Sequence, residues 1–599
     1  MSTKGTRIPE HLKVPFAGVT PAPTQEKGQD LFPTGNWRTV RPVYRDKKPP
    51  CNHACPAGER IQGYLDLVKD KKYLEAYSLI KEDMPFPTIT GRVCYHPCET
   101  ACNRGDYDDA IGIHCVERFL GDYGLSLPND VVQPKAARSE RVAVIGSGPA
   151  GMSAAYQLAR EGYQVTVFEG QGKPGGLLRG GMPEFVLPEE ILDKEIDRLK
   201  ALGIKFECHK WLGKDITWDH LKGYDAAFLG VGLTQCRKLN LQGEDTKQGV
   251  HYGQDFLTDE AQGRPHAIGK RVAVIGGGNT AVDVVRLARR KVGELVMFIC
   301  FESEVDAPAL SEEKHIVREE GGTVMDHTVV KEILNDGTKV TGIRIVKCRP
   351  GAKIPSQIEE IAGTEDTIAV DDVIVSIGQY ADLSYVPEQF RTERGLLKTD
   401  EYGRVDGSSI FAAGDAVQGA GMVVQAVGAG HKAATNIHHF LNGHVFPEAP
   451  EPDVIKIDRL NLNYFKHFPR VAQRQVPLSE RLSSYVEVNL NYNEDEAVGE
   501  ANRCFSCGTC NACDNCYIVC PDVSIARTER KNGSYYVRTD YCKGCGVCIK
   551  ECPTGCLEAV PELEFTDGVI RMETAFATTI GAHGRQREEL FELIGEVLE

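Results

Sequence analysis

Hydrophobic residues recur at helical spacing near the start of the chain and in short β-branched runs through its middle. From Ile61 to Lys81 the segment IQGYLDLVKDKKYLEAYSLIK predicts two short helices. After Glu140 the pattern changes to RVAVIG, a strand followed by glycines and by the helical segment SAAYQLAREG. The same strand, RVAVIG, begins again at Arg271. This repeat predicts two nucleotide-binding α/β units, the second inserted into the first.

Other segments lack this periodicity. Residues 1 to about 50 are rich in Pro, Lys and Arg, which predicts an extended arm. The stretch 449–499 is rich in Pro, Asn and charge and predicts a linker that wraps a folded body. The tail 565–599 ends in REELFELIGEVLE, an amphipathic pattern typical of a helix that packs on its own protein or docks on a partner.

Length and charge narrow the class of protein. With 599 residues the chain is too long for one core, and we expect three to five domains. Asp and Glu number 85 against 69 Lys and Arg, and the net charge of −16 is spread along the chain, which argues against nucleic acid as a ligand. Because there is no run of eighteen apolar residues and no apolar signal core, we expect a cytoplasmic protein without a membrane span.

The 21 cysteines gather near the two ends of the chain, six between Cys51 and Cys115 and eleven between Cys504 and Cys556. In a protein of a reducing compartment, such clustering at short gaps indicates metal binding rather than disulfides. Eight of them form two runs of the spacing CxxCxxCxxxCP. The runs are Cys510, Cys513, Cys516 and Cys520, followed by Pro521, and Cys542, Cys545, Cys548 and Cys552, followed by Pro553.

This duplicated spacing resembles that of bacterial two-cluster ferredoxins, in which the fourth cysteine of each run binds the other cluster. The resemblance implies one [4Fe-4S] cluster on Cys510, Cys513, Cys516 and Cys552 and another on Cys542, Cys545, Cys548 and Cys520. Zinc ribbons also use CxxC pairs, but they explain two proline-closed runs poorly. Neither cluster has a place for Cys504 and Cys507, which either bind a further metal with help from Cys556 or pack at the junction with the linker.

The first nucleotide fingerprint is VAVIGSGPAG, followed one strand later by an acidic residue in YQVTVFEG. Gly146 makes the tight turn, Gly148 lets backbone amides approach a pyrophosphate, and Gly151 lets helix and strand pack closely. Glu169 can accept hydrogen bonds from the ribose hydroxyls. Since strand, helix and acidic residue all occur in order, this fingerprint is stronger evidence than glycine spacing alone.

The later segments GKPGGLLRGGMPEF and IFAAGDAVQGAGMVVQAVGAG resemble the flavoprotein pattern of the glutamate synthase small subunit and of the flavin and nicotinamide half of dihydropyrimidine dehydrogenase. The resemblance implies that Gly414 and Asp415 contact the ribityl and phosphate part of FAD, and that the next helix points its N-terminus at the flavin ring. An Asp that only caps a helix would fit the same residues. The expected FAD-binding residues are Gly146, Gly148, Pro149, Ala150, Gly151, Glu169, Gly176, Leu177, Gly414, Asp415, Gln425 and Ala426.

The second fingerprint, VAVIGGGNTAVD, has the GxGxxA form, and the family places the nicotinamide nucleotide here. Members that prefer NADP carry an arginine pair after the next strand, where this chain has Phe301 and Glu302. A carboxylate would repel a 2′-phosphate but would accept a hydrogen bond from a 2′-hydroxyl, which favours NAD(H) over NADP(H). A Glu that only faces solvent is the alternative. The expected NAD-binding residues are Gly276, Gly278, Asn279, Thr280, Ala281, Glu302 and Gly378.

The segments CNHACP and GRVCYHPCETACNRG resemble the helical iron–sulfur domain of the same family. The cysteines that usually precede the position of Cys51 are absent from VRPVYRDKKPP, so the resemblance implies one N-terminal cluster instead of two, with Cys51 as a spare or alternative ligand. The implied ligands are Cys55, Cys94, Cys98 and Cys102. The chain would then hold three [4Fe-4S] clusters.

The resemblance implies hydride transfer between NAD(H) and FAD, with single electrons passing through the clusters, and requires no catalytic side chain. We therefore expect an NAD(P)H-dependent FAD/iron–sulfur oxidoreductase, as the electron-transfer subunit of a complex that exchanges electrons with ferredoxin or a catalytic partner subunit. One alternative is the glutamate synthase small subunit itself, against which the two-cluster domain and the missing arginines argue. Another is a non-catalytic electron-transfer scaffold with a degenerate nucleotide site.

These patterns predict a multidomain protein that combines α-helical, Rossmann-like α/β and ferredoxin-like α+β parts. The expected division is an extended arm at 1–50, a helical Fe–S domain at 51–138, the FAD-binding domain at 139–262 and 379–448, the inserted NAD(P)-binding domain at 263–378, a linker at 449–500, a two-cluster ferredoxin-like domain at 501–563 and a C-terminal tail at 564–599.

Overall fold

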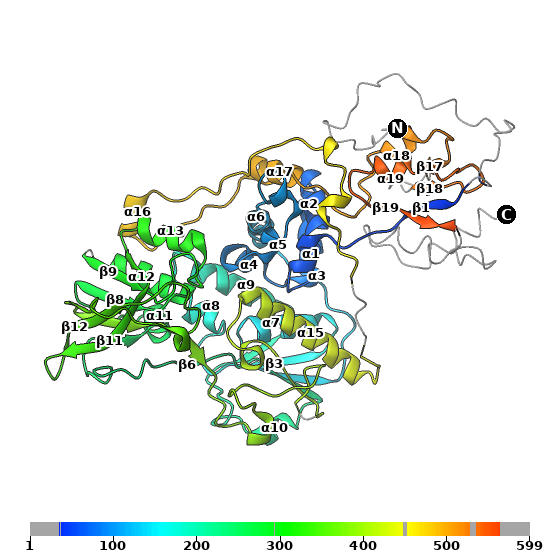
Figure 1. The fold of residues 1–599 in the computed structure, drawn as a ribbon. Coiled ribbons are helices and arrows are strands. Elements are labelled where there is room, and N and C mark those ends of the chain that lie inside the picture. Colours follow the sequence, from blue (N-terminus) through cyan, green and yellow to red (C-terminus); the bar gives the residue numbers. More distant parts are fainter. Residues whose placement is uncertain are drawn as a thin grey trace.

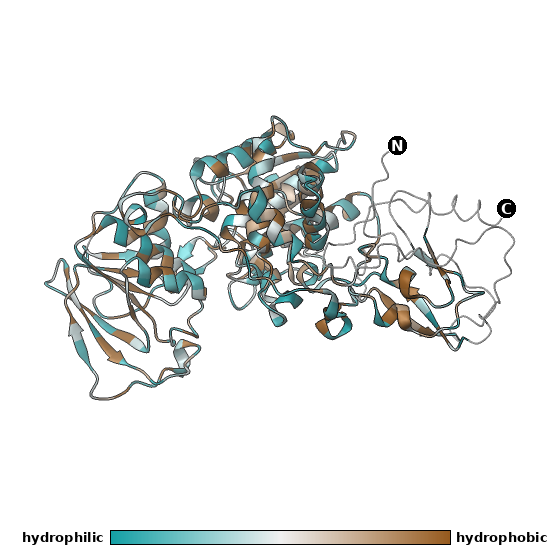
Figure 2. Cartoon of the chain, turned by 90° about the horizontal axis from the view of Figure 1, so that it is seen from above, coloured by the Kyte–Doolittle hydropathy of each residue, from teal (hydrophilic) through white to brown (hydrophobic). Residues whose placement is uncertain are grey.

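The computed structural model describes residue 35 and residues 38–292, 294–405, 407–446, 452–527 and 535–562 (Figure 1). The amphipathic helix expected in the tail and most of the expected arm lie outside these residues. Seen from above, two α/β units and a helical unit form the larger part of the molecule, and a ferredoxin-like unit lies at one end (Figure 2). In the same view hydrophobic residues concentrate on strands and on the inner faces of helices.

The helical unit contains the two helices predicted between Ile61 and Lys81, which the structure shows as α2 and α3. The pattern predicted them because their apolar residues fall on one face, and these residues pack into a core that continues into the first α/β unit. The elements of the helical unit are α1 (Pro50–Ala54), α2 (Ile61–Lys69), α3 (Tyr73–Asp83), α4 (Pro87–Val93), α5 (Pro97–Thr100), η3 (Asn103–Asp106) and α6 (Ile113–Ser126).

The first α/β unit is built on a parallel five-stranded sheet with the strand order β16-β5-β2-β3-β4. Its neighbouring strands RVAVI and AAFL are almost continuously apolar, as expected where helices cover both faces. The strands are β2 (Arg141–Ile145), β3 (Gln164–Phe168), β4 (Lys205–Glu207), β5 (Ala226–Leu229) and β16 (Ile410–Ala412), and the helices are α7 (Pro149–Arg160), α8 (Leu177–Gly180), α9 (Glu189–Ala201), α10 (Trp218–Leu221), α14 (Asp415–Gln418) and α15 (Val423–Leu441).

The second α/β unit interrupts the first, because β16 returns to the first sheet only after the second sheet is complete. Its parallel sheet has the order β10-β9-β8-β14-β7, and the second RVAVI strand lies at its centre. The predicted insertion is therefore confirmed. The elements are β7 (Val250–Tyr252), α11 (Gly253–Ala261), β8 (Arg271–Ile275), α12 (Asn279–Lys291), β9 (Leu295–Ile299), α13 (Ser311–Glu319), β10 (Thr323–Met325) and β14 (Asp372–Val375), with a flanking antiparallel sheet of β11 (Thr328–Asn335), β12 (Val340–Lys347) and β13 (Asp366–Ile368).

A short antiparallel ribbon joins the two α/β units. It pairs β6 (Gln235–Cys236), where the chain leaves the first unit, with β15 (Gln379–Tyr380), where the chain comes back. The Arg237 amide also donates to the Gly378 carbonyl at 3.0 Å, which extends the ribbon by one bond.

The ferredoxin-like unit contains a strand from the opposite end of the chain. In β1 (Val40–Tyr44) the expected arm pairs antiparallel with β19 (Leu557–Pro561), so that Val40 lies opposite Pro561. Arg38 adds a two-pronged ion pair to Glu562, with nitrogen–oxygen distances of 2.6 and 2.7 Å. The other elements of this unit are α18 (Asn515–Val519), β17 (Ile525–Arg527), β18 (Tyr535–Val537) and α19 (Val547–Lys550).

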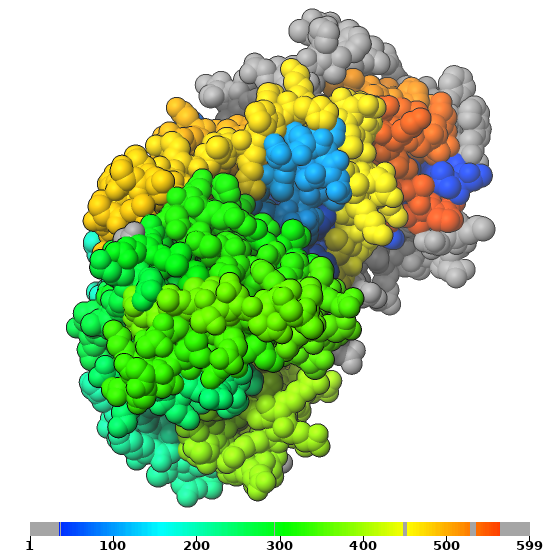
Figure 3. Space-filling view, turned by 60° about the vertical axis from the view of Figure 1, so that its left-hand side comes forward, coloured from blue at the N-terminus to red at the C-terminus, as the bar shows by residue number. Residues whose placement is uncertain are grey.

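The linker segment, residues 452–493, runs over the surface beside the helical unit and the second α/β unit (Figure 3). Its helix α16 (Leu478–Ser483) contacts the second α/β unit, where Arg481 pairs with Glu319 at 3.3 Å. It then returns to the helical unit, where Arg92 pairs with Glu487 at 2.8 Å, and ends in α17 (Glu494–Asn502), which packs on α2. None of the helices in the described part of the chain has both the length and the apolar character that a bilayer crossing needs.

Candidate functional site

The first glycine turn connects β2 to α7 at the centre of the first sheet. Gly146 has φ of +94°, and a side chain at Gly151 would come within 1.9 Å of the Gly146 carbonyl oxygen, so both positions need glycine. At Gly148 a side chain would meet no atom within 4 Å. The space before the N-terminus of α7 is therefore open, as a pyrophosphate held by backbone amides requires.

Glu169 follows β3 and turns toward this glycine turn. Its Oε2 accepts a hydrogen bond from the Ser147 amide at 3.0 Å, and its Oε1 accepts one from the Gln171 amide at 2.8 Å. The segment around Gly175 and Gly176 packs against the same glycine turn. The Gly175 amide donates to Ser147 Oγ at 2.9 Å, and a side chain at Gly176 would come within 2.7 Å of Gly148 Cα. The residues PGGL, predicted only from resemblance, thus lie against the fingerprint.

The segment with Gly414 and Asp415 approaches the same turn from β16. A side chain at Gly414 would lie 3.0 Å from Ala150 Cβ, and burial raises the pKa of Asp415 to about 6. Helix α15 then packs along α7, with Ser153 Oγ donating to the Val427 carbonyl at 2.8 Å. Gln425 and Ala426 lie in the first turn of α15, and Leu177 begins α8. The expected FAD-binding residues thus come together around the N-terminal end of α7.

The second glycine turn repeats this geometry between β8 and α12. Gly276 has φ of +145°, and a side chain there would come within 2.1 Å of the Ser376 carbonyl oxygen. At Gly278 a side chain would again meet no atom within 4 Å, and Ala281 is fully buried against the turn. Asn279 and Thr280 begin α12, and Asn279 Oδ1 accepts a hydrogen bond from the Leu310 amide at 3.0 Å. Gly378 lies in the ribbon between the units, with φ of +102°.

Glu302 lies beside this second turn, just after β9. A side chain at Gly277 would come within 2.8 Å of Glu302 Oε2, and this oxygen is buried without a hydrogen-bond partner among the described residues. Burial raises the pKa of Glu302, and the nearby ammonium of Lys314 lowers it in part. A buried acceptor without a donor costs free energy unless a hydrogen-bond donor pairs with it.

One of the two predicted C-terminal ligand sets surrounds a cavity in the ferredoxin-like unit. Cys520, Cys542, Cys545 and Cys548 all line this cavity. Cys520 comes from the first run and the other three from the second, so the structure brings together the residues of the predicted crossover.

The other predicted set also forms a group of neighbours. Burial, and less strongly the neighbouring thiols of the set, raise the pKa values of Cys513 and Cys516, whereas a hydrogen bond with Cys556 lowers the pKa values of Cys510 and Cys552. Tyr44 Oη, from β1, donates to Cys516 Sγ at 3.2 Å. Cys556 belongs beside this group, since its Sγ lies 3.6 Å from Cys552 Sγ. Cys556 does not line the cavity that contains Cys504 and Cys507.

Three of the four predicted N-terminal ligands lie together, and the fourth does not. Burial and the neighbouring thiols of Cys55 and Cys94 raise the pKa of Cys98. The buried carboxyl groups of Glu59 and Glu117 adjoin Cys55 and Cys94. Cys102 instead lines a separate cavity with Cys51. The sequence analysis missed the two carboxyl groups because neither stands at a recognisable ligand spacing from the cysteines.

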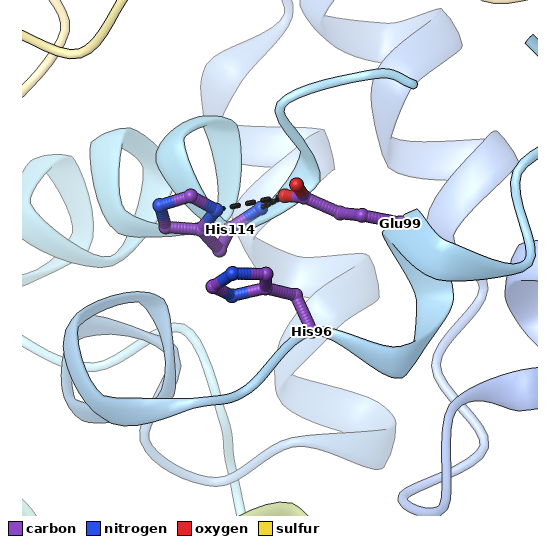
Figure 4. Close-up of side chains that lie close together, drawn as sticks. All are labelled: His96, Glu99 and His114. Carbon is purple, nitrogen blue, oxygen red and sulfur yellow. Dashed lines mark hydrogen bonds and ion pairs between the residues drawn. The ribbon is translucent and has the colours of Figure 1, made fainter. Parts of the chain in front are cut away.

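His96, Glu99 and His114 form a further compact group in the helical unit (Figure 4). The two imidazole rings stack at 4.2 Å, and Glu99 Oε1 accepts hydrogen bonds from the His114 amide at 2.9 Å and from His114 Nδ1 at 2.7 Å. Arg470 of the linker pairs with Glu99 Oε2 at 2.7 Å. Burial alone would raise the pKa of Glu99, but His114, His96 and Arg470 lower it to about 2. Glu99 is thus already neutralised by cations, and we interpret the group as the anchor of the linker rather than as a metal site.

Three sections of the chain match known families. Residues 140–430 match the family described as pyridine nucleotide-disulphide oxidoreductase, residues 43–127 match dihydropyrimidine dehydrogenase domain II with a 4Fe-4S cluster, and residues 509–556 match the 4Fe-4S dicluster domain. These matches cover the first and second α/β units, the helical unit and the ferredoxin-like unit.

Relatives match most of the chain. The chain is 33% identical to the NADPH-Fe(3+) oxidoreductase subunit beta of Geobacter sulfurreducens over 76% of this chain and 75% of the relative. It is 34% identical to the NADP(+)-dependent formate dehydrogenase subunit beta of Moorella thermoacetica over 76% of this chain and 70% of the relative. It is 32% identical to the NAD-dependent dihydropyrimidine dehydrogenase subunit PreT of Escherichia coli K12 over 66% of this chain and 91% of the relative. The chain therefore belongs to the pyridine nucleotide-dependent oxidoreductases that carry 4Fe-4S domains at both ends of a two-nucleotide core, the family that the sequence analysis named.

Proposed function

We propose that this chain exchanges a hydride between NAD(H) and a bound FAD and passes single electrons through [4Fe-4S] clusters to or from a partner. The observation that carries the proposal is that two open glycine turns and a four-cysteine cavity occur in one folded chain. When bound, FAD supplies the ability to take two electrons together and to release them one at a time. The protein's own residues hold, orient and enclose the cofactors.

The first α/β unit would hold FAD. The amides at the start of α7 face the open space at Gly148, where they can donate to a pyrophosphate, and Glu169 lies where it can accept from a ribose. Asp415 enters the same site with a carboxyl group that burial has made less acidic. Its raised pKa indicates a desolvated side chain, and a polar group of the cofactor would compensate this desolvation.

The second α/β unit would hold NAD(H) in preference to NADP(H). The support for this choice is Glu302, whose buried and unpaired Oε2 faces the glycine turn. A 2′-hydroxyl would satisfy this oxygen, whereas a 2′-phosphate would set two negative charges together in a desolvated place. Two of the relatives are named for NADPH or NADP and one for NAD, so their names do not decide the nucleotide. The preference for NAD(H) rests on Glu302.

We infer that the predicted crossover sets in the ferredoxin-like unit hold two clusters. A third cluster would lie in the helical unit on Cys55, Cys94 and Cys98. For the remaining ligand, a carboxylate of Glu59 or Glu117 is better placed than Cys102. All three relatives described above are named as subunits, which supports a role for this chain as the electron-transfer subunit of a complex with a catalytic partner subunit or with ferredoxin as the acceptor.

The test is a reduction assay on anaerobically purified, flavin-containing protein. We expect NADH to bleach the flavin absorbance and then the cluster absorbance, and kcat/KM for NADH to exceed that for NADPH when a dye or a ferredoxin accepts the electrons. Flavin that stays oxidised under NADH and under NADPH would refute the proposal. A higher kcat/KM for NADPH would refute only the choice of nucleotide.

A further inference from the structure

A second cavity lies where the helical unit meets the segment that leads into the ferredoxin-like unit. Four cysteines line it, and they come from three separate places in the chain. They are Cys51 on α1, Cys102 at the start of η3, and the CxxC pair Cys504 and Cys507 just after α17.

Buried charges hold the CxxC pair against the helical unit. Arg104 Nη1 donates to the Arg503 carbonyl at 2.6 Å, and Arg503 Nη2 pairs with Asp108 at 3.1 Å. Both arginine residues are at most 4% exposed. Arg104 also lies over the Phe505 ring at 4.7 Å. Arg104, in the helical unit, contacts the segment of the CxxC pair, and Arg503, in that segment, contacts the helical unit. Together these contacts hold Cys504 and Cys507 beside Cys51 and Cys102.

N–H groups point at the sulfur atoms of this cavity. Asn103 Nδ2 donates to Cys507 Sγ at 3.5 Å, and the Ser506 amide donates to Cys504 Sγ at 3.4 Å. Ser506 has φ of +52°, which turns its amide toward that sulfur. Burial raises the pKa of Cys102, and the nearby backbone amides of Ile111, Arg104 and Gly105 lower it in part. Such donors stabilise metal-bound thiolates and tune the potentials of iron–sulfur clusters.

The spacing of the thiols favours a cluster over a single zinc ion. A tetrahedral zinc ion with Zn–S bonds of about 2.3 Å draws its four sulfur atoms to roughly 3.8 Å from one another. Within the described parts of the chain, the one group of three or more metal-binding side chains whose ligand atoms all lie within 4.8 Å of one another is His96, Glu99 and His114. In every set of three cavity thiols at least one pair therefore lies more than 4.8 Å apart, and the four thiols surround a space in which an iron–sulfur core can lie.

We propose that Cys51, Cys102, Cys504 and Cys507 hold a further [4Fe-4S] cluster, the fourth in the chain, whose ligands come from both ends of the sequence. The sequence analysis expected a single N-terminal cluster because no cysteine precedes Cys51 in the segment before it. The folded chain supplies the two additional thiols from the segment after α17.

The position of this site makes it a link between the other clusters. Cys51 precedes Cys55 by four residues on a helical segment, about 6 Å along its axis. Cys507 precedes Cys510 by three residues, which a fully extended chain spans in about 10 Å. The site thus adjoins the Cys55 group on one side and the ferredoxin-like unit on the other. This relay role rests on the proposed function, whereas the metal site does not.

The test of the metal site is the iron and acid-labile sulfide content of the full-length protein, purified without oxygen. We expect Cys504→Ser combined with Cys507→Ser to lose about four iron and four sulfide per chain. Cys208→Ser, in the first α/β unit, is the matched control and should lose none. Flavin content per chain shows whether each variant has folded.

Substitutions of the two N-terminal cysteines test whether all four cysteines bind the same cluster. Cys51→Ser and Cys102→Ser should each remove or destabilise the same cluster signal in low-temperature electron paramagnetic resonance as the double variant. Unchanged iron in the double variant, loss of one zinc instead of iron, or different missing signals from the two ends would each overturn the proposal.

The relay is tested by rapid mixing with NADH. We expect the double variant to reduce the clusters of the ferredoxin-like unit at least tenfold more slowly than the Cys208→Ser control. If the proposed function fails, NADH reduces neither protein, while the iron measurement still decides whether the site exists. If both proteins reduce these clusters at the same rate although iron is lost, the relay role is refuted.

Discussion

At the scale of single residues, the Glu302 carboxyl group is available to pair with a ligand. Glu302 is 7% exposed, and one of its oxygen atoms has no donor among the described residues. In a folded protein such a group costs free energy unless something pairs with it. The nearby Glu304, by contrast, is paired with Arg318 at 2.8 Å. Two acidic residues of one loop therefore have different roles.

Replacing Glu302 should change the choice of nucleotide. We expect Glu302→Ala to lower kcat/KM for NADH by about ten- to a hundredfold, which corresponds to the roughly 1.5–3 kcal/mol of a hydrogen bond to a charged group. The value for NADPH should stay level or rise, because the repulsion is removed. Steady-state kinetics with both nucleotides checks this, and Glu304→Gln is the control. Equal losses for the two nucleotides would show that Glu302 supports the loop without contacting the ribose.

Glu195 predicts a pH dependence of stability. It lies on α9 with 3% exposure, one of its oxygen atoms has no hydrogen-bond partner among the described residues, and burial raises its pKa to about 7. The folded state keeps a proton that the unfolded state releases near pH 4.5. The group therefore stabilises the fold at low pH, and this contribution is lost as pH rises from 4.5 through about 7.

Glu195→Gln should remove this pH dependence. Relative to the exposed control Glu190→Gln, we expect the variant's unfolding free energy to fall less between pH 5 and pH 7.5, by at most about 3 kcal/mol. Urea unfolding of the apoprotein at the two pH values measures the difference. Parallel pH profiles for the two variants would mean that another buried acid accounts for the effect.

At the scale of elements, the strands and helices that depend only on neighbouring residues could be predicted from local sequence patterns. The strands β2 and β8 and the helices α2 and α3 follow from runs and periods of a few residues. The glycine turns follow from spacing, since a side chain at Gly146, Gly151 or Gly276 would clash with backbone of the same α/β unit. These features could be read from the sequence with their boundaries nearly correct.

Features that depend on distant residues could not be predicted in this way. Strand β1 looked like part of an aperiodic arm because its partner, β19, lies at the other end of the chain. Cys504 and Cys507 looked unassigned because spacing reveals only ligands that are neighbours in sequence. Glu59, in the loop before α2, and Glu117, on α6, could not be singled out, since an acidic residue is ordinary until its burial is known.

The pairing of β1 with β19 should stabilise the ferredoxin-like unit. Deleting residues 1–44 would leave one edge of β19 without hydrogen bonds and remove the contact of Tyr44 with Cys516. We expect amide hydrogen exchange at Leu557–Pro561 to become at least tenfold faster than in the full chain. A shorter deletion, of residues 1–34, leaves β1 in place and is the control. Unchanged exchange in the longer deletion would show that β19 does not depend on β1.

For the whole molecule, the cluster sites differ in their exposure. In the ferredoxin-like unit Cys545 is exposed, whereas Cys55 and Cys98 of the helical unit are 8% and 7% exposed. An exposed ligand suits a cluster that meets an external partner, and buried ligands suit clusters that serve internal transfer. The second α/β unit and the ferredoxin-like unit lie on opposite sides of the helical unit (Figure 1).

This difference predicts the order in which iron is lost. With a strong chelator in the absence of oxygen, we expect the cluster on Cys520, Cys542, Cys545 and Cys548 to be removed first, several-fold faster than the clusters of the helical unit. Paramagnetic resonance of dithionite-reduced samples taken over time distinguishes the signals. Loss of the helical unit's signal first would contradict the exposure of the sites.

The pairing of β1 with β19 can form only late in translation. Residues 40–44 leave the ribosome early, but their partner at 557–561 is made more than five hundred residues later. Cys51 and Cys102 are likewise made long before Cys504 and Cys507, which line the same cavity. Contacts of such long range form late and slowly, so the oxidoreductase core can fold during translation while both ends remain open. A nascent chain that lacks residues 557–561 therefore cannot form the β1–β19 pair.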